Sequence, residues 1–225
     1  MNILITGASK GIGKAVALHL AKDPQHSIIG LSRSIKPGKE WPDNLYPLTF
    51  DLSEKDQMEA LKVTLQQKIK HIDLLINNAG LLINKPFGEI TDNDWTSVYE
   101  TNVFAPARLI RTLLPLFSAG SHIVNIASMG GVQGSQKFPG LSAYSSSKMA
   151  LAGLTECLAV DFAPQQISVN CLCPGAVDTE MLQAAFPGIT GAMPPAQIAE
   201  FVAWFGLHGH KTMNGKILPL SLSTP

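Results

Sequence analysis

Short apolar runs alternate with amphipathic stretches along the whole chain. The short runs predict strands, and apolar residues that recur every three or four positions predict helices. The predicted strands cover residues 2–6, 27–32, 45–50, 71–76, 121–127, 166–172 and 216–220. The predicted helices cover residues 11–21, 53–69, 91–117, 142–162 and 195–207, with a kink at Pro106 in the third.

This alternation predicts an α/β fold of the Rossmann type, doubly wound, with helices on both faces of a mostly parallel seven-stranded sheet. Several predicted strands have apolar residues at nearly every position, as burial on both faces requires. No internal repeat, low-complexity tract or linker interrupts the pattern. Residues 1–225 are therefore expected to form a single domain.

Charge and cysteine content narrow the classes of function. Lys plus Arg and Asp plus Glu number 17 each, so no net field attracts nucleic acid or an anionic membrane. No apolar run is long enough to span a bilayer, and no secretory leader is recognisable at the N-terminus. The three cysteines lack a disulfide framework, and Cys171 and Cys173 lie in a predicted strand. We expect buried thiols and a cytoplasmic location.

A glycine-rich loop joins the first strand to the first helix. Such a loop brings the backbone close to a ligand, and the start of the helix presents free N–H groups to a phosphate. A tight turn without a ligand is the alternative, because the spacing Gly-x3-Gly-x-Gly differs from the commoner dinucleotide fingerprint. The candidate pyrophosphate-binding residues are Gly7, Ser9, Lys10, Gly11, Ile12 and Gly13.

Arg33 follows the second predicted strand, where folds that prefer NAD usually carry an acidic residue for the ribose hydroxyls. A guanidinium at this point can bind a 2′-phosphate through two hydrogen bonds, and Lys10 adds a second cation nearby. The sequence therefore favours NADP(H) over NAD(H). The alternative is that Arg33 is a solvated loop charge.

Tyr144 and Lys148 are four residues apart in a predicted helix, so both lie on one face. A free tyrosine has a pKa of about 10 and is a poor acid or base at neutral pH. A nearby ammonium favours the phenolate and is expected to lower the pKa of Tyr144 toward a useful range. Alone, this spacing often arises by chance.

The spacing does not stand alone, because residues 2 to about 180 resemble the short-chain dehydrogenase/reductase family in its common single-domain form. The resemblance rests on a set of segments in a fixed order: Thr6–Gly13, Asp51-Leu52, Asn77–Gly80, Asn102, the segment ending at Ser128, Tyr144 with Lys148, and residues 174–179.

The resemblance implies a set of catalytic roles. Tyr144 would be the general acid in reduction and the base in oxidation, and Ser128 would hydrogen-bond the same substrate oxygen. Lys148 would lower the pKa of Tyr144 and bind the nicotinamide ribose. Asn102 would hold a water that links Lys148 to solvent. Each residue could instead serve only local structure.

The resemblance also implies cofactor contacts beyond the glycine loop. Asp51 would meet the adenine amino group, with Leu52 beside it. The segment containing Asn78, Ala79 and Gly80 would shape the adenine-ribose side and brace the sheet. The nicotinamide would lie against the later segment, formed by Pro174, Gly175, Val177 and Thr179.

The chain also departs from the family pattern. Ser128 lies 16 residues before Tyr144, about three more than is usual, and the extra length falls in residues 134–139. Residues 180–194 leave room for only a short or mobile lid over an open cleft. The family's usual Asp-Gly-Gly ending is replaced by residues 221–225. A homodimer or homotetramer through residues 92–118 and 142–162 is expected by analogy.

The leading hypothesis is an NADP(H)-dependent oxidoreductase, such as a carbonyl reductase, that acts on a small carbonyl or alcohol substrate. The alternatives are a non-catalytic NADP-binding regulatory protein and an epimerase or dehydratase of sugar nucleotides. No metal is required, and His208-x-His210 is interpreted as a loop pair rather than a chelating site. The sequence specifies neither the substrate nor the physiological direction.

Overall fold

The computed structural model describes residues 1–222, which contain a seven-stranded sheet with every strand parallel. The strand order is β3-β2-β1-β4-β5-β6-β7, so the order reverses between β1 and β4. The predicted doubly wound α/β class is confirmed. The strands are β1 (Asn2–Thr6), β2 (Ser27–Ser32), β3 (Leu45–Thr49), β4 (Ile72–Asn77), β5 (Phe117–Ile126), β6 (Ser168–Pro174) and β7 (Ile217–Leu220).

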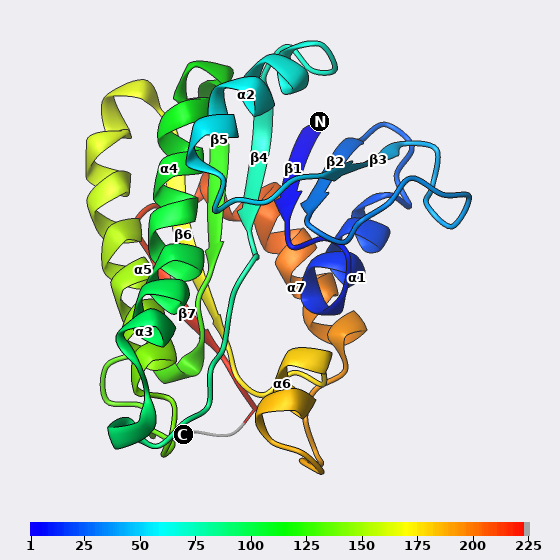
Figure 1. Ribbon diagram of the computed structural model, residues 1–225. Coiled ribbons are helices and arrows are strands. Elements are labelled where there is room, and N and C mark those ends of the chain that lie inside the picture. Colours follow the sequence, from blue (N-terminus) through cyan, green and yellow to red (C-terminus); the bar gives the residue numbers. More distant parts are fainter. Residues whose placement is uncertain (223–225) are drawn as a thin grey trace.

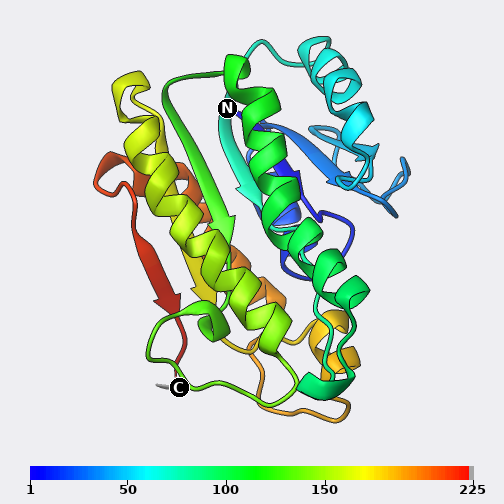
Figure 2. The same cartoon turned by 60° about the vertical axis from the view of Figure 1, so that its left-hand side comes forward.

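Helices cover both faces of the sheet (Figures 1 and 2). On one face α1 (Gly11–Leu20) packs against α7 (Pro195–His208), and on the other lie α2 (Met58–Gln66), α4 (Ala105–Leu113) and α5 (Ser142–Asp161). Successive side chains of β1 alternate between the faces, so Ile3 and Ile5 join the α1 cluster whereas Leu4 joins the α2 cluster. All three are fully buried, which explains the continuous apolar run.

The predicted helix over residues 91–117 is divided. Thr91 caps α3 (Asp92–Tyr99) by accepting a hydrogen bond from the Asp94 N–H at 3.1 Å. A π turn (Glu100–Phe104) then separates α3 from α4, and the Ala105 N–H donates to the Glu100 carbonyl five residues back. Pro106 follows at the start of α4 and has no N–H to continue the regular ladder. The kink predicted at Pro106 is thus a π turn just before it.

Two further boundaries differ from the prediction. Ser53 does not cap a helix, because its hydroxyl and N–H both donate to the Asp51 carboxylate, and a 3₁₀ turn (Lys55–Gln57) precedes α2. β5 begins at Phe117 rather than at residue 121, and its pairing with β4 shifts register between Ile72 and Leu74. The added residues are mostly exposed, so they lack the apolar pattern that identifies a buried strand.

Candidate active site

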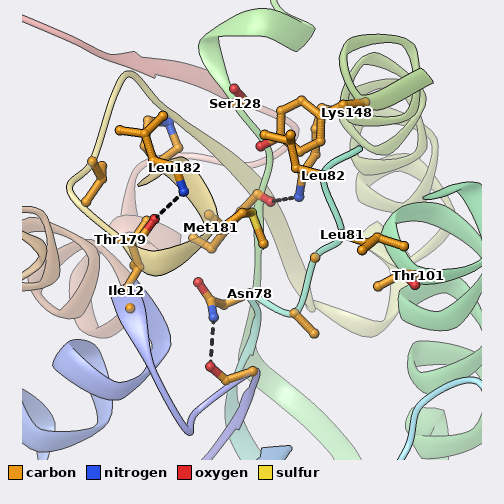
Figure 3. Close-up of a pocket in the computed structure, with 18 of the residues that line it drawn as sticks. Ile12, Asn78, Leu81, Leu82, Thr101, Ser128, Lys148, Thr179, Met181 and Leu182 are labelled. Atoms are coloured by element: carbon orange, nitrogen blue, oxygen red, sulfur yellow. Dashed lines mark hydrogen bonds between the residues drawn. The ribbon is translucent and has the colours of Figure 1, made fainter. Parts of the chain in front are cut away.

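A cavity of about 1100 Å³ opens along the carboxyl ends of the central strands. It includes the point between β1 and β4 where the strand order reverses, which is where open α/β sheets bind ligands. The short α6 (Glu180–Ala185) lies beyond the same ends of the strands (Figure 1). In Figure 3, Ile12 and Asn78 lie toward one end of the cavity, and Ser128 and Lys148 lie toward the other.

The glycine loop forms one end of this cavity. Gly7 and Gly11 have φ angles of 69° and 55°, a backbone region that favours glycine. Gly13 has no room for a side chain, because a Cβ there would overlap the Asn78 Nδ2 atom and the Gly7 carbonyl oxygen. The same Nδ2 donates to the Thr6 and Gly7 carbonyls at 3.1 and 3.3 Å. The loop is thus clamped to the residue that follows β4.

Changing Gly13 to alanine should therefore displace either Asn78 or the loop. Because overpacking costs about 1–3 kcal/mol, we expect a lower melting temperature and about tenfold weaker dinucleotide binding. Thermal unfolding and fluorescence titration with NADPH would measure the two effects. Gly153→Ala is the matched control, because a Cβ at that α5 position meets nothing within 4 Å. Unchanged NADPH affinity in Gly13→Ala would contradict a phosphate-binding role for this turn.

The start of α1 and the end of β2 present polar groups to the cavity. No side chain among residues 1–222 caps α1, whose first turn also lacks acidic residues. The Ser9 hydroxyl lies 2.8 Å from that of Ser32 and accepts a hydrogen bond from that of Ser34 at 3.0 Å. Arg33 lies between these two serines, is exposed and lines the cavity together with Lys10. The result is a cationic, hydroxyl-rich edge beside the glycine loop.

Ser128, Tyr144 and Lys148, the residues predicted to be catalytic, come together at the other end, and we call them the catalytic set. Ser128 follows β5, and α5 carries the other two. The Ser128 hydroxyl lies close enough to the Tyr144 phenol to favour its ionised form. The Lys148 ammonium lies 5.9 Å from the centre of the Tyr144 ring and donates to the Ile126 carbonyl at 2.8 Å. The longer loop between Ser128 and Tyr144 therefore does not separate the two side chains.

The predicted lowering of the Tyr144 pKa by Lys148 is not found. The pKa of Tyr144 is raised because burial penalises the phenolate, and the nearby Ser128 hydroxyl offsets only part of this effect. Burial also lowers the pKa of Lys148 to about 8, so the ammonium is itself held in an unfavourable environment. Desolvation is the largest cause of the pKa shift of each group, and the spacing of residues along a helix carries no information about burial.

Asn102 is fully buried in the π turn, and its side-chain amide forms hydrogen bonds with neighbouring protein groups. Its Oδ1 accepts from the Leu81 N–H at 2.8 Å, and its Nδ2 donates to the Leu81 carbonyl and the Ser147 hydroxyl, both at 2.9 Å. A Cβ on Gly80 would lie 3.4 Å from both Asn102 Oδ1 and Lys148 Nζ. Asn102 therefore fixes the segment after β4 beside Lys148, and its role in a proton relay stays a prediction.

The remaining predicted cofactor residues also line the cavity. Thr179 caps α6 through a 3.3 Å hydrogen bond from the Leu182 N–H, and its Cγ2 would lie 3.2 Å from a Cβ on Gly11. The start of α6 thus lies over the glycine loop. The other lining residues from the predicted set are Asp51, Leu52, Ala79, Gly80, Pro174, Gly175 and Val177.

The lining residues that the prediction missed include Ser32, Ser34 and Ser221. Ser32 and Ser34 flank Arg33, and the hydroxyl pair around that cation is a signal the sequence did offer. Ser221 also lines the cavity, and a Cβ on Gly175 would lie 3.1 Å from its hydroxyl. It belongs to the segment after β7 that departs from the family pattern.

The cysteine interpretation agrees with the structure, whereas the two histidines do not form a loop pair, because His208 ends α7 and His210 lies in the following 3₁₀ turn. Within residues 1–222 no group of three or more His, Cys, Asp or Glu side chains could hold a metal. His208 is exposed, whereas His210 packs against His122 with ring centres 5.5 Å apart. Cys171 and Cys173 are fully buried with their sulfurs 3.9 Å apart, on one face of β6 as predicted. None of the helices in residues 1–222 has the length and apolar character to cross a membrane.

Comparisons of the sequence and of the structure with known proteins point to the same family. A family profile described as short chain dehydrogenase matches residues 1–189. The chain is 33% identical over 209 residues to a 3beta-hydroxysteroid dehydrogenase of Mediterraneibacter gnavus, covering 88% of this chain and 72% of that protein.

Two solved structures with different cofactors are also similar to this chain. One is described as 4-hydroxyisoleucine dehydrogenase complexed with NADH, with 27% identity and a TM-score of 0.81. The other is described as ElxO with NADP bound, with 26% identity and a TM-score of 0.83. Each comparison covers 97% of this chain and 96% of the other.

Proposed function

Because this chain belongs to the short-chain dehydrogenase family, and is thereby an oxidoreductase that binds a nicotinamide cofactor, we propose that it is specific for NADP(H) and interconverts a carbonyl and an alcohol. The observation that carries the proposal is the catalytic set, in which the Ser128 and Tyr144 side chains meet beside the Lys148 ammonium. All three side chains line one cavity with the glycine loop. This arrangement favours an enzyme over a regulatory cofactor-binding protein.

The residues present fit an NADP(H) molecule. The glycine loop leaves the space that a Cβ at Gly13 would fill, and the start of α1 offers N–H groups to a pyrophosphate. Arg33 and Lys10 supply two cations at the end of β2, which suits a 2′-phosphate. The adenine would then lie near Asp51, whose carboxylate is held by Ser53 at 2.8–2.9 Å. When bound, the nicotinamide supplies or accepts the hydride.

The chain's own groups would handle the oxygen and the proton. In the reducing direction, Ser128 donates a hydrogen bond to the substrate oxygen as negative charge develops there. Tyr144 then donates its proton to that oxygen. The raised pKa of Tyr144 keeps the phenol protonated at neutral pH, which suits this role. Lys148 holds its ammonium beside the phenol and would stabilise the phenolate that remains.

We further propose a cytoplasmic homodimer or homotetramer assembled through α4 and α5. Phe104 in the turn before α4 is 51% exposed, and Val160 on α5 is 74% exposed. Exposed apolar side chains of this size on the expected contact helices support association. The free, buried thiols of Cys171 and Cys173 are consistent with a reducing compartment.

The direct test is a panel of ketones and aldehydes assayed by the loss of NADPH absorbance, run in parallel with NADH. We expect turnover with at least one carbonyl and a higher kcat/KM for NADPH than for NADH. Turnover of no carbonyl in the panel, with NADPH binding intact, would favour the regulatory alternative. A preference for NADH would contradict the assignment of Arg33 while leaving the catalytic set standing.

A further inference from the structure

Beyond the catalytic set, the cavity is walled by apolar side chains from three separate segments. The segment after β4 contributes Leu82, and α6 contributes Met181 and Leu182, which Figure 3 shows on the other side of the cavity. Phe186 follows α6. The third segment, residues 132–141, contributes Phe138 and Leu141. Phe138 is 51% exposed although it lines the cavity, so its ring offers apolar surface to a ligand.

Hydrogen bonds connect these three walls to one another. The Asn84 side chain donates to the Ala185 carbonyl at 2.8 Å, which ties the segment after β4 to the end of α6. The next residue, Lys85, donates its N–H to the Gly140 carbonyl at 3.1 Å, which ties the same segment to the loop that carries Phe138. The loop that carries Phe138 and the end of α6 are thereby held by adjacent residues of one segment, and Phe138 lines the cavity there.

Hydrogen bonds within the loop that carries Phe138 also fix its fold. The Ser135 hydroxyl lies 2.6 and 2.9 Å from the Met129 and Val132 carbonyls. These contacts fold the extra residues between Ser128 and Tyr144 back onto the turn that follows Ser128. The added length therefore places an aromatic side chain in the cleft wall.

No lining side chain at this end, among residues 1–222, offers a cation to a substrate anion. Lys10 and Arg33 belong to the glycine-loop end, and Lys148 donates to the Ile126 carbonyl. Glu180, at the start of α6, also lines the cavity, and its side chain carries a negative charge.

The two lysines close to these walls, Lys85 and Lys137, interact with neighbouring groups of the protein. The Lys85 ammonium pairs with Asp94 at 2.7 Å. The Lys137 ammonium donates to the Val132 carbonyl and the Ser135 hydroxyl at 2.7 and 2.6 Å. A carboxylate placed at this end would lose hydration and gain no cation from the lining side chains of residues 1–222, which is costly.

We propose that this end of the cavity selects neutral, apolar carbonyl compounds over those that carry a carboxylate, and that Phe138 is the side chain that sets the preference. The inference rests on the proposed function, since it names the substrate class of the same site. Phe138 acts by contact with the carbon skeleton and not on the reacting atoms.

A matched pair of substrates tests the preference. 2-Octanone and 7-oxooctanoate have the same chain and the same methyl ketone, and differ only in a terminal methyl against a carboxylate. With NADPH we expect kcat/KM for 2-octanone to exceed that for 7-oxooctanoate by about 100-fold. Calorimetric titration of the NADP-loaded protein should likewise show tighter binding of 2-octanol than of 7-hydroxyoctanoate, a readout that needs no turnover.

Variants at Phe138 assign the effect to one side chain. Phe138→Ala should weaken 2-octanol binding by about tenfold, equivalent to about 1.4 kcal/mol. Phe138→Arg should raise the affinity for 7-hydroxyoctanoate, a gain that cannot come from misfolding. Phe87→Arg is the matched control, because Phe87 is 73% exposed and lies outside the cavity. It should change neither affinity.

The outcomes separate the two proposals. If no carbonyl is reduced but 2-octanol binds more tightly than 7-hydroxyoctanoate, the oxidoreductase mechanism fails and the selectivity of the cavity stands. Equal binding of the two alcohols, no detectable binding of 2-octanol, or tighter binding of the hydroxy acid overturns the inference whatever the panel shows. An unchanged preference in Phe138→Arg overturns the assignment to Phe138.

Discussion

Replacement of Tyr144 by phenylalanine is expected to lower kcat by about 10²–10⁴-fold, the contribution typical of a general acid or base. The variant loses one hydroxyl, from a side chain that lines the cavity close to Ser128. The dinucleotide is proposed to be held mainly by the glycine loop, Arg33 and Lys148, so its affinity should change by less than about twofold. Steady-state rates and NADPH titration by fluorescence separate the two quantities.

Tyr46→Phe is the matched control for this variant. Tyr46 lies on β3, is 43% exposed and does not line the cavity, so the same chemical change should leave kcat unchanged. A Tyr144→Phe enzyme that keeps more than about half of its wild-type rate would exclude the phenol as proton donor. The Ser128 hydroxyl or a solvent molecule would then have to supply the proton.

Local patterns predicted most of the elements and the proximity of Tyr144 to Lys148, for physical reasons. The strand β1 carries Ile3, Leu4 and Ile5 in succession because both of its faces are buried, and such a run is visible in the sequence. The pairing of Tyr144 with Lys148 was predictable because helix geometry fixes residues four apart on one face. Ser128 was placed by resemblance alone, since its approach to Tyr144 depends on how the chain between them folds.

Properties that arise from tertiary packing could not be predicted. The pKa of Tyr144 depends mainly on how deeply the phenol is buried. The spacing of Tyr144 and Lys148 along the helix indicates only that a positive charge is near, and it says nothing about burial. The helix predicted from residue 53 begins only at Met58, because the Ser53 hydroxyl donates to the nearby Asp51 carboxylate and does not cap the helix. The hydrogen bond from Asn84 to the end of α6 joins positions about 100 residues apart, and no local pattern indicates it.

The second large effect is expected at Arg33, where a change to aspartate should reverse the cofactor preference. The wild-type guanidinium is exposed at the cavity wall between Ser32 and Ser34, where a 2′-phosphate would lie. A carboxylate there repels that phosphate but can accept hydrogen bonds from the ribose hydroxyls of NADH. Loss of a charge partner costs about 2–5 kcal/mol. The ratio of kcat/KM for NADPH to that for NADH should therefore fall by at least about 30-fold.

Lys39→Asp provides the comparison for this charge reversal. Lys39 is an exposed cation in the loop after β2, but it does not line the cavity. The variant changes the net charge as Arg33→Asp does, so any long-range effect on NADPH should be shared by both. Raised salt should weaken NADPH binding to the wild type more than to Arg33→Asp, because screening acts on the charge pair that only the wild type has. If the ratio of kcat/KM for NADPH to that for NADH were equal in the two variants, Arg33 would be a solvated loop charge and another group would bind the 2′-phosphate.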